Sequence, residues 1–355
     1  MRKAITGMSA ALAGALLLLA QSPAPAPLAL PEEKHLRNVR QLTFGGENAE
    51  AYFSADDQQL ILQHSGGEVP CDQIYTMAVN PPAEYGAPVF RLVSTGKGRT
   101  TCSYFFPDGK RILFSSTHLA GPECPPRPDY SRGYVWPIHA AYDIYTARPD
   151  GSDLRRLTSS PGYDAEATIS RDGKKILFTS TRDGDLELYA MDANGKHVRR
   201  LTHEVGYDGG AFFSPDGKKI VYRAQHPTTP EAVADYKTLL AQGLIRPGNL
   251  ELWVMDADGS HKRQVTHNGA ANFAPFWHPD GRRIIFASNM ADPKGRDFDL
   301  YLIHEDGTGL ERVTYSPEFD GFPMFSADGR KLVWASNRHN AKRGDTNIFL
   351  GDWVE

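Results

Sequence analysis

The residues Phe213-Ser214-Pro215-Asp216-Gly217-Lys218 form a turn motif that the chain repeats along most of its length. Four more copies occupy residues 105–110, 169–174, 277–282 and 325–330, and a degenerate copy without the glycine occupies residues 53–58. The shared aspartate stands at positions 56, 108, 172, 216, 280 and 328, at intervals of 52, 64, 44, 64 and 48 residues. Self-similarity on this scale is the sequence signature of a repeat architecture.

Each turn motif lies between two short, β-prone apolar segments, which predicts a hairpin. Proline pre-sets φ for the turn, aspartate bonds back to the backbone and glycine takes the left-handed position. A third strand over residues 186–191 and, after a second turn, a fourth over residues 198–202 complete the unit, and the order recurs over residues 250–266 and 300–314. Four short antiparallel strands per unit of 44 to 64 residues are typical of a β-propeller blade, so we predict an all-β propeller with six blades.

The last repeat ends one strand short, because residues 347–353 form only its third strand. Residues 39–43, ahead of the first repeat, copy the fourth-strand pattern of residues 199–202 and 312–314. We predict that this N-terminal strand completes the last blade and closes the ring, since closure removes the exposed sheet edges. The predicted propeller therefore covers residues 39–355.

Composition and the N-terminus limit the possible partners and the compartment. A formal net charge of −4 gives no concentrated basic surface, so we expect no nucleic-acid partner. Residues 1–20 have the basic, apolar and small-residue layout of a signal peptide, and residues 21–38 form a leader rich in proline and alanine. We expect a periplasmic or secreted monomer with no transmembrane segment in the mature chain. A retained N-terminal anchor is the alternative.

Export to an oxidising compartment changes how the three cysteines are interpreted. Cys71 and Cys102 fall on predicted strands, whereas Cys124 falls in a long loop. One disulfide and one remaining thiol are expected, with Cys71 and Cys102 as the preferred pair. The spacing of the cysteines does not support a metal site.

With its repeats laid out, the chain resembles the TolB-type propellers built from the repeat often called PD40. The resemblance rests on residues 199–202, 213–220 and 251–260 and covers nearly everything after the leader. It implies an interaction role in the cell envelope. We expect no counterpart of the sizeable α/β domain that precedes the propeller in TolB.

Alignment of the repeats on the turn motif places six polar residues at one position near the start of each innermost strand. This strand-start ring comprises Asn48, Thr100, Asp164, Asp208, Asn272 and Asp320, and two residues further on Glu50 and Glu166 add negative charge. In one interpretation each aspartate bonds to neighbouring backbone amides and fixes the connection between blades. In the other, an acidic channel mouth attracts a cation, a basic peptide segment or a polar ligand.

The loops between second and third strands open on that same face. Their candidate residues are His64, Thr117, His118, Arg182, Gln225, His226, Asn289, Asn337 and Arg338. Oligogalacturonate lyases, which are propellers with similar repeats, use a histidine and glutamine metal cluster. This resemblance implies His64, His118, Gln225 and His226 as ligands of a divalent metal ion, in the alternative function only.

Two insertions enlarge the same face. Residues 119–141 carry Tyr134 and Trp136, and residues 227–248 contain a stretch, 230–240, in which Pro230 and the later Gly243 predict a helix. Both insertions either cap the propeller or line a pocket for a partner.

We therefore expect an exported, non-catalytic module, without a cofactor, that binds a protein, a peptide or another ligand through the loop-rich face. The alternative is a propeller enzyme, a metal-assisted lyase or hydrolase acting on a carbohydrate or similar polar substrate. The sequence contains neither a Gly-x-Ser-x-Gly nor a His-Glu-x-x-His motif.

Overall fold

The computed structural model describes residues 28–81, 89–131 and 133–355. The predicted signal peptide and the first part of the leader lie outside the described residues. Within the described ranges, no helix is both long and apolar enough to cross a membrane.

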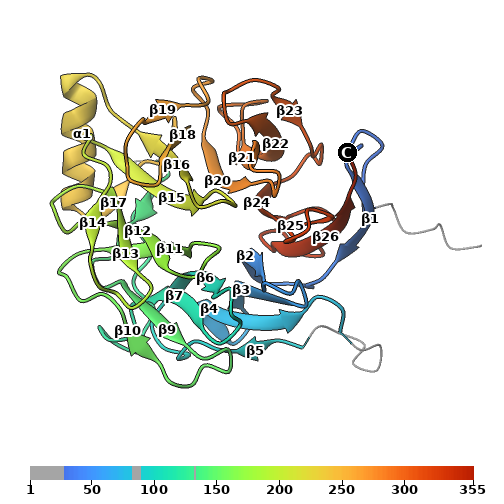
Figure 1. Ribbon diagram of the computed structural model, residues 1–355, viewed down its shortest axis with the longest axis horizontal. Helices are drawn as coiled ribbons and strands as arrows, with labels where there is room; N and C mark the ends of the chain where they lie inside the picture. Colours follow the sequence, from blue (N-terminus) through green and yellow to red (C-terminus); the bar gives the residue numbers. More distant parts are fainter. Residues whose placement is uncertain (1–27, 82–88, 132) are drawn as a thin grey trace, which may run out of the picture.

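Six four-stranded antiparallel sheets stand around a central axis in chain order (Figure 1), which confirms the predicted propeller. Blades 1 and 2 comprise β2 (Glu47–Phe53), β3 (Gln59–Gly66), β4 (Val69–Ala78) and β5 (Arg91–Leu92), then β6 (Thr100–Phe105), β7 (Ile112–Ser116), β9 (Asp143–Ala147) and β10 (Arg155–Arg156). Blades 3 and 4 comprise β11 (Asp164–Ile169), β12 (Lys175–Ser180), β13 (Glu187–Asp192) and β14 (Arg199–Arg200), then β15 (Tyr207–Phe213), β16 (Lys219–Gln225), β18 (Glu251–Asp256) and β19 (Arg263–Gln264). Blades 5 and 6 comprise β20 (Asn272–Trp277), β21 (Arg283–Ser288), β22 (Asp299–His304) and β23 (Glu311–Arg312), then β24 (Asp320–Phe325), β25 (Lys331–Ser336), β26 (Asn347–Trp353) and β1 (Leu36–Gln41).

The turn motif forms the hairpin between the first two strands of a blade, as its chemistry predicts. In blade 4 the Ser214 hydroxyl donates to Asp216 Oδ1 at 2.7 Å, and the Lys218 backbone N–H donates to the same oxygen at 3.1 Å. Gly217 has φ +71°, the left-handed conformation that its missing side chain permits. The turn between the third and fourth strands lies on the same face, because the Ala257 N–H donates to the Lys218 carbonyl. We call this face the hairpin face and the opposite one the mouth face.

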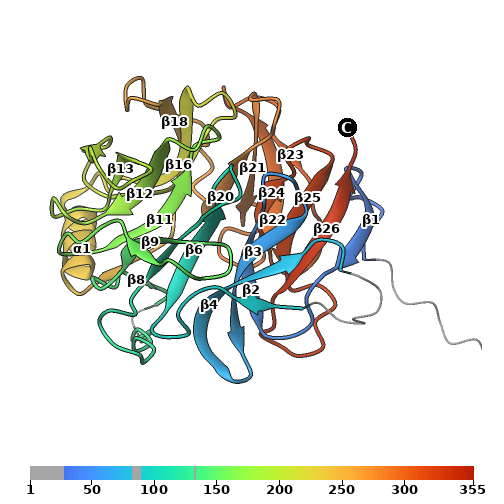
Figure 2. The ribbon, with the colours of Figure 1, turned by 60° about the horizontal axis from the view of Figure 1, so that its bottom comes forward.

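Strand β1 closes the ring, as predicted, by pairing antiparallel with β26 (Figures 1 and 2). The propeller begins earlier than residue 39, however. Leu36 pairs with Trp353 and is buried, and the His35 ring stacks on that tryptophan at 4.7 Å. Glu33 is also buried, against Arg338. These contacts assign the end of the predicted leader to the propeller.

The disulfide joins Cys71 to Cys124, with Cα atoms 5.9 Å apart, so the preferred pairing of Cys71 with Cys102 is wrong. The loop that carries Cys124 turns back to blade 1, where the Gly98 N–H donates to the Pro122 carbonyl at 2.9 Å. Cys102 is the free thiol, and its innermost strand bulges there. The pairing thus follows the return path of a loop rather than the placement of strands.

The two insertions meet on the mouth face. Strand β8 (Trp136–Pro137) of the first pairs with β17 (Leu244–Ile245) of the second in a small sheet of their own. The predicted helix is α1 (Pro230–Ala241), which begins after the cap residue Thr229 and lies at the edge of the molecule in both views. Its buried Tyr236 donates to the Gly206 carbonyl at 2.6 Å, which ties the second insertion to the connection between blades 3 and 4.

Candidate functional site

Every innermost strand loses its pairing register at the same point, two residues after the strand-start ring. The residue at that point has a left-handed φ between 50° and 58° in all six blades. A β-bulge re-aims the side chains around it, so this position faces differently from the rest of the strand. We call these six residues the bulge ring: Glu50, Cys102, Glu166, Gly210, Ala274 and Phe322.

A cavity of about 1020 Å³ opens at the mouth face, and we call it the mouth cavity. Four of the six residues of the bulge ring line it: Glu50, Cys102, Glu166 and Phe322. The insertions contribute Tyr134 and Trp136 to its lining, whereas no residue of α1 is part of that lining. Arg296 from blade 5 places its guanidinium 4.7 Å from the Tyr134 ring and so connects opposite sides of the mouth.

Aromatic side chains fill the channel on the hairpin-face side of the bulge ring. Tyr52 contacts Tyr104 and Phe212, with ring centroids 5.2 and 6.0 Å away, and Phe212 contacts Phe276 at 5.3 Å. Tyr52 and Phe212 are buried. This aromatic cluster joins blades 1, 2, 4 and 5 across the axis.

One side of the cavity is a polar wall organised by Glu166. Its Oε2 accepts hydrogen bonds from the Tyr207 hydroxyl at 2.8 Å and the Gly210 N–H at 2.6 Å, and its Oε1 accepts one from the Tyr163 hydroxyl at 3.1 Å. Arg223 completes the network, with Nη2 at 3.3 Å from Glu166 Oε2 and Nε donating to the Tyr207 hydroxyl at 2.9 Å. Burial raises the pKa of Tyr207, so the phenol stays a donor. Glu166 and Arg223 therefore balance each other in a rigid arrangement.

Glu50 differs from Glu166 because it lacks such partners. Its Oε2 is buried and has no hydrogen-bond partner among the described residues. Burial raises the pKa of Glu50 to about 7, although a hydrogen bond from the Cys102 thiol and the charge of Arg223 lower it. Burial also raises the pKa of the Cys102 thiol, which therefore stays protonated at neutral pH.

A third polar group surrounds Arg99. Its Nε lies 3.6 Å from Asp72 Oδ2, which makes an ion pair but no direct hydrogen bond. His139 Nε2 is buried without a partner among the described residues, and burial together with the charge of Arg99 lowers the pKa of His139. The imidazole is thus neutral near pH 7.

The opposite side of the cavity is apolar. Four phenylalanines from blades 5 and 6 pack with ring centroids 5.0 to 6.2 Å apart, and we call them the phenylalanine wall: Phe273, Phe298, Phe319 and Phe322. Three of them are only partly buried, so their faces remain available at the cavity.

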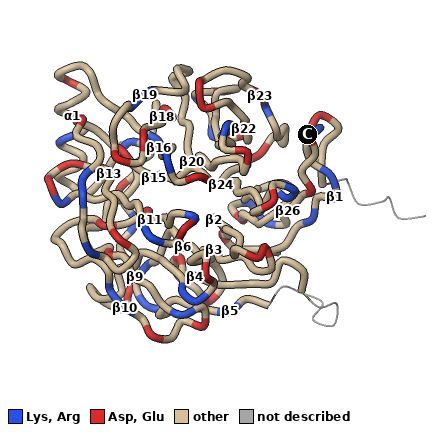
Figure 3. Tube along the Cα trace, in the orientation of Figure 1, with Lys and Arg blue, Asp and Glu red and all other residues tan. Residues whose placement is uncertain are grey.

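The charges that line the mouth cavity are mixed, in contrast to the expected acidic mouth. The lining contains both carboxylates and cations: Glu47, Glu50, Asp72 and Glu166, and Arg99, Arg223, Arg246, Lys294 and Arg296. Figure 3 shows the same interspersion around the whole ring.

The strand-start ring explains the difference, because its six residues are buried behind the wall and only Asn48 lines the cavity. Its aspartates do not bond chiefly to backbone amides, as one interpretation of the sequence suggested, but pair with an arginine or a histidine of their own blade. The pairs are Asp164 with Arg182 at 2.9 Å, Asp208 with His226 at 3.1 Å and Asp320 with Arg338 at 2.8 Å. Hence Arg182 and Arg338, expected on the loop face, are internal partners.

The uncharged members of the ring do bond to the backbone. Asn48 Nδ2 donates to the carbonyls of Gly45 and Thr346, and Asn272 Nδ2 donates to that of Leu250 at 2.8 Å. The Thr100 hydroxyl donates to the Asp72 carbonyl at 2.9 Å. These bonds tie blades 1, 2 and 5 to the blade that precedes each of them in the ring.

The candidate metal ligands are not gathered into one site. His64 Nδ1 bonds to Asn48 at 2.9 Å, His118 Nδ1 bonds to Ser116 at 2.9 Å, and His226 pairs with Asp208. Gln225 pairs with Tyr207 in the blade 4 sheet. Within the described part of the chain, the acidic, histidine or cysteine side chains close enough to share an ion are Glu187, Glu204 and Asp208, a set with none of these four residues.

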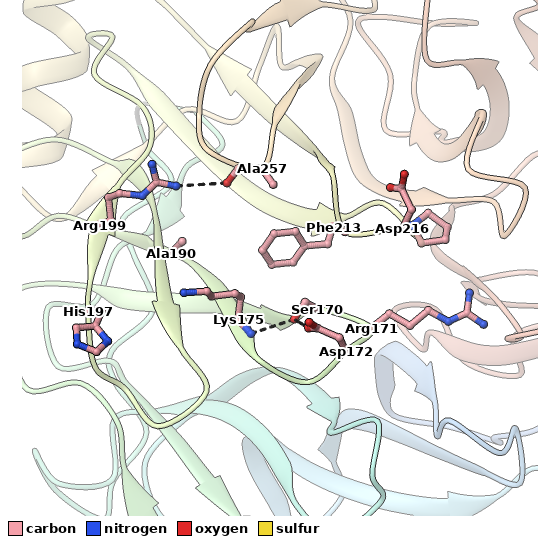
Figure 4. Close-up of a pocket in the computed structure, with 12 residues that line it drawn as sticks. Ser170, Arg171, Asp172, Lys175, Ala190, His197, Arg199, Phe213, Asp216 and Ala257 are labelled. Atoms are coloured by element: carbon pink, nitrogen blue, oxygen red, sulfur yellow. Dashed lines mark hydrogen bonds between the residues drawn. The ribbon is translucent and has the colours of Figure 1, made fainter.

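A second hollow, of about 310 Å³, lies on the hairpin face between blades 3 and 4 (Figure 4). Its lining side chains are engaged in turn contacts. The Ser170 hydroxyl donates to Asp172 at 2.7 Å, Lys175 Nζ donates to Asp192 at 2.6 Å, and Arg199 donates to the carbonyls of Ala257 and Asp258. It therefore supports the blades rather than extending the mouth cavity.

Sequence reasoning missed Tyr163, Tyr207, Arg223 and the phenylalanine wall. A signal for the bulge ring was present, because its members stand six residues before the shared aspartate in every repeat. No regular alternation predicts the bulge itself.

Comparisons with known proteins agree with this architecture. Residues 132–247 match the family model of the tricorn protease N-terminal beta propeller domain, and residues 226–346 match that of the TolB beta propeller domain. A TolB homolog from Chlorobium luteolum is 44% identical over 50 residues, which is 14% of this chain and only 12% of that protein.

Two solved structures share the fold. TolB from Acinetobacter baumannii is 19% identical with a TM-score of 0.55, covering 87% of this chain and 64% of that one. Oligogalacturonate lyase from Vibrio parahaemolyticus is 12% identical with a TM-score of 0.52, covering 88% and 93%. At these identities the likeness concerns the fold alone.

Proposed function

Since the chain belongs to the TolB-like family of six-bladed β-propellers, we propose that it is a non-catalytic binding module whose mouth cavity receives a segment of a partner chain or a small ligand. The proposed setting is the cell envelope, after removal of residues 1–20. The protein would act there as a monomer, and its partners would be proteins or peptides.

The mouth cavity itself is the observation that carries this proposal. Its volume of about 1020 Å³ is at the upper end of the range usual for ligand sites, and it combines an apolar wall with a few placed polar groups. Tyr134 at its rim is 51% exposed, and aromatic side chains at a rim are frequent anchors for partner chains. The Glu166 and Arg223 network gives the wall a fixed shape, which reduces the entropic cost of binding.

A displayed peptide library, selected on the immobilised full chain, tests this function. We expect the selected peptides to bind in calorimetry with affinities that fall at least about tenfold in Tyr134→Ala. Leu310→Ala is the matched control, because Leu310 is 50% exposed but lies in the turn before β23 on the hairpin face. Failure to select any binder, or peptides sensitive to Leu310→Ala and insensitive to Tyr134→Ala, would refute the proposal.

The alternative enzyme would need His64, His118, Gln225 and His226 to converge on a metal ion, and each histidine is instead bonded within its own blade. A titration with Mn²⁺ separates the two functions. We expect no stoichiometric binding that depends on His226, whereas binding lost in His226→Ala would favour the metal-assisted lyase or hydrolase.

A further inference from the structure

Glu50 occupies a seam of the bulge ring. Its neighbour on one side is Cys102 of blade 2, and its neighbour on the other is Phe322 of blade 6, because β24 and β26 of the closing blade flank β2. The polar wall therefore ends, and the phenylalanine wall begins, at the Glu50 carboxyl group.

Of the three carboxyl groups around this seam, two are paired with an arginine and one is not. Glu166 is balanced by Arg223 at 3.3 Å and Asp72 by Arg99 at 3.6 Å. Glu50 forms no ion pair among the described residues, and its buried Oε2 accepts no hydrogen bond from them. A buried acceptor in this state costs free energy that a ligand donor would recover.

The other charged residues of the cavity lining surround Glu50 and these two ion pairs. Arg296 is held against the Tyr134 ring, and Glu47, at the exposed start of β2, has the opposite charge. Lys294 and Arg246 also line the cavity. These cations repel a positively charged ligand. Such a ligand would therefore bind only through direct contact with the Glu50 carboxylate.

The apolar side of the seam defines the rest of the ligand. Phe322 and Phe319 lie with ring centroids 6.2 Å apart, and Phe273 lies 5.4 Å from Phe322. Aromatic or long aliphatic groups gain free energy by burial against such rings, and a cation beside them gains further from the ring faces.

We propose that this seam is a subsite for a protonated primary amine carried on an aromatic or apolar body, with the ammonium on Glu50 and the body on the phenylalanine wall. This inference rests on the proposed binding function and names the chemistry of its ligand. A free arylalkyl amine and the amino-terminal aromatic residue of a partner chain share that chemistry.

Binding and ionisation of Glu50 are linked. Because the pKa of Glu50 is about 7 in the empty cavity, its carboxyl is mostly ionised at pH 8 and mostly protonated at pH 6. The titratable groups that interact with it are Cys102, Asp72, Glu166, Tyr52 and Tyr142, and Arg223 is the cation whose charge lowers its pKa. An ammonium ligand should therefore bind roughly tenfold more tightly at pH 8 than at pH 6.

Calorimetry on the full chain with 2-phenylethylamine at pH 8 tests the subsite. We expect saturable binding, and at least about tenfold weaker binding of 2-phenylethanol and 3-phenylpropanoate, which keep the body and change the charge. Glu50→Gln should weaken the amine about tenfold and abolish the pH dependence. Glu231→Gln, which removes the same charge from an exposed position in the first turn of α1 and outside the cavity lining, should leave both unchanged.

Two further arms keep the test decisive. Phe319→Ala should weaken 2-phenylethylamine but not methylamine, and near-ultraviolet circular dichroism should show that it and Glu50→Gln stay folded. A Phe-Gly dipeptide amide that binds more tightly than 2-phenylethylamine, and loses binding when N-acetylated, would identify a partner chain as the source of the amine. The reverse order would identify a free amine.

Three results would overturn the proposal: no saturable amine binding at pH 8, equal binding of the alcohol, or unchanged binding in Glu50→Gln. Library peptides that still require Tyr134 would then show that the binding function stands without this subsite.

Discussion

The strand-start ring and the bulge ring lie two residues apart on the same six strands, yet they differ in composition and in how many of their residues line the mouth cavity. The strand-start ring is polar in all blades and buried, and its bonds hold the blades and their loops together. The bulge ring holds two acids, a thiol, a glycine, an alanine and a phenylalanine, and most of its members line the mouth cavity. The first ring therefore serves the fold, and the second is free to define a ligand.

The largest expected effect comes from breaking an ion pair behind the strand-start ring. Arg338 is almost fully buried between Asp320 and Glu33, with Nη2 at 2.8 and 2.9 Å from their carboxylates. Arg338→Ala leaves two buried carboxylates unpaired and should lower the free energy of unfolding by about 3–5 kcal/mol in urea denaturation. Arg330→Ala removes an exposed arginine from the same blade and should cost less than about 0.5 kcal/mol. Equal losses in both variants would show that burial is not the cause.

A second test concerns the pairing rule of the same ring. Asp164 and Asp320 each pair with an arginine 18 residues later and Asp208 pairs with a histidine there, whereas Asn272 has Met290 at that position. Asn272→Asp places an unpaired carboxylate beside Glu251 and should cost about 2–4 kcal/mol at pH 8. The double variant with Met290→Arg should regain much of the loss. If the arginine restores nothing, the rule does not transfer between blades.

The free energy of unfolding that Glu50 contributes should fall as pH rises, whereas the contribution of an ion-paired carboxylate rises with pH. The pKa of Glu50 rises from 4.5 to about 7 on folding, so the native state binds this proton more tightly than the unfolded chain does. Stability linked to Glu50 is thus present below pH 4.5 and is lost as pH rises to 7. Glu50→Gln should match the wild type at pH 4 and exceed it by about 3 kcal/mol at pH 8. Denaturation curves at the two pH values check this, and a constant difference would contradict it.

The smallest expected effect separates backbone strain from side-chain contact within the bulge ring. Gly210 has φ +58°, and a Cβ there would meet Arg223 Cζ at 2.9 Å. Gly217 has φ +71° with open space around it. Both substitutions to alanine carry the left-handed cost of about 1 kcal/mol, but Gly210→Ala should lose about 1 kcal/mol more as Arg223 shifts. Thermal denaturation of the pair measures the excess, and identical losses would mean that Arg223 moves freely.

The sequence predicted the blades and the closing strand because turn chemistry is local and repeats itself. It also placed the strand-start ring correctly along the chain. It could not predict where those side chains point. Regular alternation puts Asp164 and Glu166 on the same side of their strand, but the bulge at Glu166 separates them, and only Glu166 reaches the cavity.

The same limit explains the cysteines and the cavity lining. The choice of Cys124 over Cys102 depends on how a loop returns to Gly98, which spacing does not encode. Likewise Arg223 and Phe319 come from strands and loops far apart in sequence, so only the closed ring brings them to one cavity.

The closing strand also has a kinetic consequence. The His35 ring donates to the Val354 carbonyl across 319 positions, among the longest separations the fold contains. Contacts of such range form slowly, because most of the chain must be ordered before they can be made. The edge of β26 in blade 6 therefore stays unpaired until β1, at the other end of the propeller, has joined it. During folding, that edge is the point at which misassembly with another chain would begin.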